Sequence, residues 1–187
     1  MTHKKFPESY YRRVVSEILT QIDLLKQTGN PEQVLEDTLE MLSQLLHLNR
    51  GRVFLWDDYS QSLHIRYAYN LSTVEMSKGK YEICEGITGE VFDTQNAALI
   101  EDINAVTNYK GKVTPRKQEE NSPKVSYIAV PIVHKDSSLG VLAVETIAHY
   151  DGDMEANALI LRMVAEMFAE IIDTYDLTEF LDTQQVA

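Results

Sequence analysis

The chain of 187 residues is long enough to bury one substantial core and too short for two ordinary domains joined by a linker. Hydrophobic residues make up 44% of it, as in a globular protein, and no apolar run is long enough to span a bilayer. The 29 acidic residues against 17 basic ones give a net charge of −12, which disfavours direct binding to a nucleic-acid backbone.

Two amphipathic helices are predicted at the start of the chain. Over residues 9–25 the apolar residues recur in alternating steps of three and four, as in a coiled-coil seam, at Tyr11, Val15, Ile18, Ile22 and Leu25. Gly29 suits a left-handed helix end, Asn30 suits a helix N-cap, and Pro31 is tolerated in a first turn. A second helix is therefore expected from Pro31 to about Leu48.

A β-hairpin is predicted next, followed by short elements. Residues 53–56 form an apolar, aromatic run, and residues 63–69 alternate between apolar and polar side chains, which is typical of strands. Ser72 and Glu75 have the spacing of a capping box for a short helix. Brief extended segments are expected at 80–84 and 98–103, with a short helix around the glycines of residues 86–92.

The segment 104–124 shows no periodicity and is basic within an acidic chain. It holds five basic residues (Lys110, Lys112, Arg116, Lys117 and Lys124) against Glu119 and Glu120, a local charge of +3. Long loops inside compact domains are usually functional lids or disordered segments. A lid that closes on an anion and a solvated loop are both open interpretations.

Two apolar runs at 127–133 and 139–144 predict a central hairpin, and a last helix is expected from Asp153 to about Leu181. This helix carries a broad apolar stripe of heptad spacing that includes Leu161, Phe168 and Tyr175. The order of elements predicts an α+β fold: an antiparallel sheet with helices packed on one face and long terminal helices.

Four pieces of sequence resemble GAF domains when taken in order: residues 86–91, 99–103, 126–132 and 139–145. Over residues 30 to 149 the chain is similar above all to the amino-terminal GAF domain of bacterial nitrogen-fixation activators, which act with the nitrogen-type sigma factor. The resemblance implies an antiparallel sheet of five or six strands, a ligand pocket on the face away from the terminal helices, and a homodimer formed through those helices. It divides the chain into an amino-terminal coupling helix (1–29), a sensor core (30–150) and a carboxy-terminal coupling helix (151–187).

The residues considered for a ligand site are those that end strands or open the short helix, together with Arg66 as an anion partner on the strand 63–69. They are Arg66, Gly86, Thr88, Asp102, Tyr127 and Glu145. Arg66 and Tyr67 alternate along that strand, which places them on opposite faces. For Gly86 plain turn geometry is the competing interpretation. The resemblance implies a small anionic metabolite such as 2-oxoglutarate.

The two terminal helices are hypothesised to project beyond the sheet and pair across the dimer. The residues expected in that seam are Tyr11, Val15, Ile18, Ile22, Leu25, Leu161, Phe168 and Tyr175. Related activators carry ATPase and DNA-binding domains, but this chain has neither a phosphate-binding loop nor a basic recognition helix. It is therefore expected to be a sensor that acts on domains outside itself, and a ligand-free dimerisation scaffold is the alternative.

No catalytic machinery, cofactor or metal site is predicted. The single cysteine, Cys84, excludes an internal disulfide and a cysteine-based zinc site. It also argues against the sulfoxide reductases related to GAF domains, whose chemistry needs several cysteines. Cys84 is expected to be a small buried side chain, with a reactive thiol as the alternative. Residues 1–10 lack the apolar stretch of a signal peptide, which favours the cytoplasm.

Overall fold

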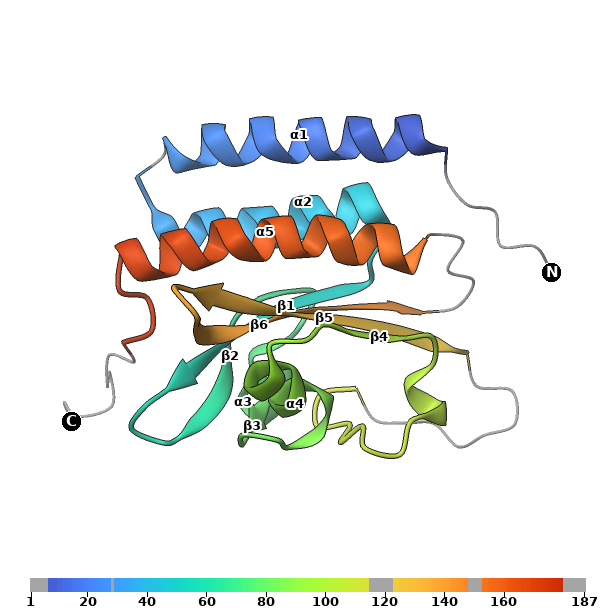
Figure 1. Ribbon diagram of the computed structural model, residues 1–187, viewed down its shortest axis with the longest axis vertical. Helices are drawn as coiled ribbons and strands as arrows, with labels where there is room; N and C mark the ends of the chain where they lie inside the picture. The colour runs from blue at the N-terminus through green and yellow to red at the C-terminus, as the bar shows by residue number, and fades with distance from the viewer. Residues whose placement is uncertain (1–6, 28, 115–122, 148–152, 180–187) are drawn as a thin grey trace.

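The computed structural model describes residues 7–27, 29–114, 123–147 and 153–179, and Figure 1 shows how their elements are layered. The helices are α1 (Glu8–Lys26), α2 (Pro31–Leu46), α3 (Thr73–Lys78), α4 (Gly86–Thr94), the 3-10 helix η1 (Ile103–Ala105) and α5 (Met154–Thr174). The strands are β1 (Arg50–Asp57), β2 (Ser62–Tyr69), β3 (Lys80–Tyr81), β4 (Ala98–Ile100), β5 (Val125–His134) and β6 (Ser137–Ile147).

The strands form one antiparallel sheet of six in the order β3-β2-β1-β6-β5-β4. The first strand in sequence pairs with the last at the centre of the sheet, so residues far apart in the chain meet there. The predicted α+β fold and both predicted hairpins are confirmed.

Both faces of the sheet are buried, each under its own apolar cluster. Val53 and Leu142 belong to the cluster beneath α2 and α5, whereas their neighbours Phe54 and Val141 belong to the cluster on the other face. Helices α3 and α4 lie on that second face (Figure 1). The long helices are thus on one face as predicted, but the short helices cover the opposite one, because strands that are apolar on both sides need two covers.

Helix α1 does not project from the domain, which corrects the expected dimer seam. Ile18 and Ile22 have exposed fractions of 0% and 1% and pack in the chain's own core, as do Leu161 and Phe168 of α5. Val15 is half-buried against the same core, and the side chain of Leu25 lies outside the described residues. Of the eight seam residues, only Tyr175 is mostly exposed among those whose side chains are described, with a fraction of 55%.

The turn between α1 and α2 explains this position. Gly29 has a φ of +75°, and the Asn30 side chain accepts a hydrogen bond from the backbone of Gln33, so α1 folds back along α2 as an outer layer (Figure 1). The Tyr11 hydroxyl then accepts a 3.0 Å hydrogen bond from the backbone N–H of Asp153 at the start of α5. A coiled-coil spacing fits this intramolecular packing as well as it fits a dimer.

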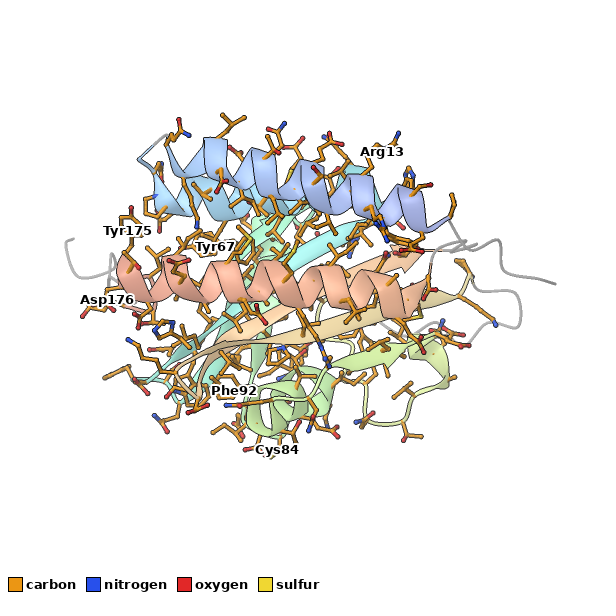
Figure 2. The ribbon with its side chains drawn as sticks, turned by 45° about the horizontal axis from the view of Figure 1, so that its top comes forward. Arg13, Tyr67, Cys84, Phe92, Tyr175 and Asp176 are labelled. Atoms are coloured by element: carbon orange, nitrogen blue, oxygen red, sulfur yellow. The ribbon has the colours of Figure 1, made fainter. Side chains whose placement is uncertain are left out.

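Helix α5 ends at Thr174, earlier than predicted, in a Schellman motif. Asp176 takes a left-handed φ of 53°, and the Leu177 N–H donates to the Ile172 carbonyl over 3.0 Å. Leu177 also packs against the core. Figure 2 shows Tyr175 and Asp176 where the helix stops. The expected end at Leu181 lies outside the described residues.

Candidate functional site

A buried cluster of polar side chains lies on the sheet face opposite the long helices. Its centre is Arg52 of β1, with an exposed fraction of 2%, and Glu145 of β6, with 0%. Arg52 donates from Nη2 to the Glu145 carboxylate. The pairing of β1 with β6 aligns Arg50 with Glu145, so Arg52 is the diagonal neighbour of Glu145 on the same face. We call these two residues with Thr114, Tyr81, Tyr109 and Tyr127 the Arg52 cluster.

One nitrogen of Arg52 has no hydrogen-bond partner in the part of the chain that the structure describes. Nη1 is buried, and among the described residues nothing forms a hydrogen bond with it. Leaving a buried charged donor unsatisfied is costly, so native structures rarely keep one without a reason. A guanidinium edge is also the geometry that suits a carboxylate or phosphate. Nη1 is therefore a candidate contact for an anionic group.

Three tyrosines surround the guanidinium. Its central carbon lies 5.5 Å from the ring centroid of Tyr127, and the rings of Tyr127 and Tyr109 meet edge to face at 5.9 Å. Burial raises the pKa of Tyr109 to about 12, against a smaller opposite effect of Arg52, and burial likewise raises the pKa of Tyr81. Tyr81 and Tyr109 thus carry neutral hydroxyl groups at physiological pH, and the three rings offer aromatic faces that suit a cation.

The part of the loop that precedes residue 115 closes over the cluster. Tyr109 and Val113 have exposed fractions of 7% and 6%. The Thr114 hydroxyl donates to the second Glu145 oxygen over 2.7 Å and accepts from Arg50 Nη1 over 3.4 Å. The described part of this segment is therefore packed against the cluster and is not a solvated loop.

Lys112 links this covering segment of the loop to the rest of the domain. Its Nζ forms an ion pair of 2.6 Å with Glu85 and lies 4.6 Å from the ring centroid of Tyr81. The Lys112 charge therefore already has a carboxylate partner. Arg116, Lys117, Glu119 and Glu120 of the predicted lid lie outside the described residues, and Lys124 is exposed.

Comparison with known proteins decides the family. The family model described as "GAF domain" matches residues 30–153. The chain belongs to the GAF domain family. This confirms the family that the four sequence pieces predicted.

Two curated relatives and one solved structure are similar to this GAF domain. The nitrogen fixation protein AnfA of Azotobacter vinelandii is 27% identical over 150 residues, and the Nif-specific regulatory protein of Herbaspirillum seropedicae is 28% identical over 172 residues. These alignments cover 79% and 88% of this chain but only 28% and 31% of the relatives. The GAF domain of a phosphoenolpyruvate-protein phosphotransferase from Coxiella burnetii superposes with a TM-score of 0.75 at 18% identity, over 90% of this chain and 96% of that one.

Three of the six predicted site residues meet in this GAF domain. Glu145 binds Arg52, and the hydroxyl groups of Thr88 and Tyr127 lie 3.0 Å apart on the same face. Gly86 opens α4 with a φ of 63°, and a β-carbon there would lie 2.9 Å from Lys110 Cγ. Turn geometry, which was the competing interpretation, therefore explains why residue 86 is a glycine.

Asp102 lies at the site's margin and has a structural task. Its carboxylate caps η1 by accepting from the backbone and side chain of Asn104 over 3.0 and 2.9 Å. It also accepts from the backbone N–H of Val125 over 3.4 Å. These bonds tie η1 to the start of β5 and account for the carboxylate without a ligand.

Arg66 is not part of the cluster, which corrects its predicted role. The register of β1 and β2 pairs Val53 with Tyr67 and Phe54 with Ile65, so Arg66 is the extra residue of a β-bulge. Its charge acts on the Tyr67 hydroxyl, which donates to Glu32 of α2 over 3.3 Å. Figure 2 shows Tyr67 on the long-helix side. The alternation rule that separated Arg66 from Tyr67 does not hold across a bulge.

Arg52 is the central residue that the sequence did not single out. It follows Arg50 and Gly51 and lies just before the apolar run 53–56 that predicts the strand. The signal that could have found it is charge placement: Arg52 directly precedes one buried strand run, and Glu145 directly follows another. A buried strand bordered by a cation and one bordered by an anion can pair their charges when they are neighbours.

Cys84 is exposed rather than buried, contrary to expectation. Its Sγ donates to the Asp93 carboxylate over 3.3 Å, and this bond raises the thiol pKa. The described residues contain no group of three or more metal-binding side chains. No helix in the described part of the chain has the length and apolarity needed to cross a membrane.

Proposed function

We propose that this GAF domain is the ligand-responsive regulatory part of a bacterial transcriptional activator and works in the cytoplasm. The names of its relatives and the fraction of their length that it spans support this role. In this proposal the ATPase and DNA-binding output domains lie outside the chain. The observation that carries the ligand-binding part is the buried Nη1 of Arg52, which lacks a partner among the described residues.

The proposed ligand is a small metabolite that carries a carboxylate. Its carboxylate would take the free edge of Arg52, and the neutral tyrosine hydroxyls would contact its other polar atoms. 2-Oxoglutarate is the compound that the family resemblance suggests, and it is the first to test. A regulatory rather than enzymatic role fits the single exposed thiol, whose raised pKa keeps it protonated.

The sheet offers a short route from the site to the long helices. Tyr127 lies in the cluster around the site, and the next residue of β5, Ile128, lies in the core under α5. Glu145 and Val144 of β6 are related in the same way. A ligand that displaces Tyr127 or Glu145 would therefore displace a core contact of the helices by movement of the same strand.

A homodimer is proposed on the outer face of the helices. Because the predicted seam is used within the chain, the available apolar residues are Leu19 and Leu24 of α1 and Leu159 of α5, with exposed fractions of 41%, 52% and 66%. Pairing through these residues would place the moving helices at the interface. A ligand-free scaffold is the second candidate, favoured by the close cover that Tyr109 and Val113 form over Arg52.

Native mass spectrometry combined with calorimetry tests the proposal. A dimer that retains or binds 2-oxoglutarate or another carboxylate, and loses it on Arg52→Lys, is the expected result. Arg162→Lys, an exposed site on α5, is the matched control and should leave binding unchanged. A dimer that binds no small carboxylate would support the scaffold, and a monomer would contradict the dimer.

A further inference from the structure

Three cations in or beside the cluster are each paired with a carboxylate in the described part of the chain. Arg52 pairs with Glu145, Arg50 pairs with Glu75 at 3.1 Å, and Lys112 pairs with Glu85 at 2.6 Å. A dianionic ligand would therefore add two negative charges beside the buried carboxylate of Glu145. In a site of low dielectric, that like-charge contact is strongly unfavourable.

Glu145 also has capacity for another donor. Its Oε1 accepts from Arg52 and its Oε2 accepts from Thr114, whereas a carboxylate can accept about four hydrogen bonds. Counting the described residues, the site thus presents a donor on Arg52 without a partner next to an acceptor on Glu145 that can take further hydrogen bonds. A ligand that brings a carboxylate and a cationic donor on neighbouring atoms satisfies both.

We infer that the Arg52 cluster takes an α-amino acid, with the ligand carboxylate on Arg52 Nη1 and its ammonium group on Glu145. This inference rests on the proposed function and narrows its ligand class. The zwitterionic head group adds no net charge beside the ion pair of Arg52 and Glu145. Glu145 is then the residue that separates amino acids from 2-oxo acids of the same carbon skeleton.

Matched ligand pairs test this directly. Calorimetric titration of the 187-residue chain would compare L-glutamate with 2-oxoglutarate, L-leucine with 4-methyl-2-oxopentanoate, and L-alanine with pyruvate. Within each pair only the group on the second carbon differs. In the pair whose side chain fits the site, we expect the amino acid to bind about tenfold more tightly or better. Its ammonium group can donate a hydrogen bond to the Glu145 carboxylate, whereas the 2-oxo group cannot.

Two variants isolate Glu145. Glu145→Gln keeps the side-chain size, removes the charge and should abolish the preference for the amino acid. Arg162→Lys changes an exposed residue of α5 outside the cluster, keeps the charge of Glu145, and should retain the preference. Far-ultraviolet circular dichroism would confirm that both variants fold. The comparison of matched ligands in the unmodified chain does not depend on either variant.

The outcomes separate this inference from the proposed function. If the 2-oxo acid binds the unmodified chain as tightly as its amino acid or more tightly, the inference is wrong and the sensor proposal stands. A Glu145→Gln variant that keeps the preference also overturns the role of Glu145. If neither class binds the unmodified chain at millimolar concentration, both the inference and the ligand-responsive function fail.

Discussion

Thr88 of α4 and Tyr127 of β5 share a hydrogen bond of 3.0 Å between their hydroxyl groups, inside a cluster that is otherwise largely apolar. Tyr127→Phe would leave the buried Thr88 hydroxyl without this partner and should lower the free energy of unfolding by about 1–3 kcal/mol. Thr88→Val should act similarly, and the double variant should lose less than the sum. Urea unfolding of the four proteins measures the coupling, and strict additivity would show that the two hydroxyl groups are independent.

Arg52→Met should be the most damaging substitution in the cluster. It leaves the buried Glu145 carboxylate without its cation, which costs about 3–5 kcal/mol in proteins. The double variant Arg52→Met/Glu145→Gln should recover much of that loss because no buried charge remains. Chemical unfolding followed by circular dichroism compares the three proteins, and a double variant no more stable than the single one would contradict this explanation.

The Arg52→Met variant should also become sensitive to pH. A lone buried carboxyl has a raised pKa, so the folded state binds a proton more tightly than the unfolded state does. Stability of the variant then falls as the pH rises above the unfolded value of about 4.3. Unfolding at pH 5 and at pH 8 should show a larger deficit, relative to the unmodified chain, at pH 8.

Alkaline pH should destabilise the unmodified protein in a defined range. Burial raises the pKa of both Tyr67 and Tyr109 from 10.0 to about 12. Their contribution to stability is fully present below pH 10 and is lost as the pH rises through 12, because the unfolded state releases these protons first. Phenolate absorbance and circular dichroism, recorded together from pH 9 to 12.5, should show late tyrosine ionisation that coincides with unfolding. Tyr109→Phe should reduce the loss.

Asp176→Gly should stabilise the domain. Asp176 has a left-handed φ of 53° and places a negative charge at the end of α5, and both features are unfavourable. The expected gain is about 0.5–1 kcal/mol, or roughly 1–4 °C in Tm. Asp176→Ala removes the charge but keeps a β-carbon. If alanine stabilised as much as glycine, backbone strain would not be the cause.

The elements that could be predicted are those governed by local rules. The Asn30 cap and the Ser72 and Glu75 capping box depend on residues close in sequence, and both are present, as is the strand predicted from Leu63. Glu145, Tyr127 and Thr88 were found as candidates because residues at strand ends and helix starts often border sites. Sequence spacing alone could not show that these three residues lie close together.

The features that were missed depend on contacts between distant residues. Arg52 and Glu145 are 93 positions apart, and only the pairing of β1 with β6 brings them together. The bulge at Arg66 depends on the register with β1, which no local pattern reveals. The stripe through Ile18 and Ile22 indicates that something covers it, but spacing does not say whether the cover is the same chain or another copy.

The Schellman motif at the end of α5 has a mechanical consequence. A helix that continued straight past Thr174 would be rigid and would transmit its rotation and its translation along the axis to the next element. Here the helix ends with Asp176 in the left-handed conformation, and Leu177 packs against the core. The end of α5 is therefore fixed to the domain and would not transmit rotation of the helix past that point. The domain can therefore transmit a shift in the position of this helix end, and that position depends on how α5 packs against β5.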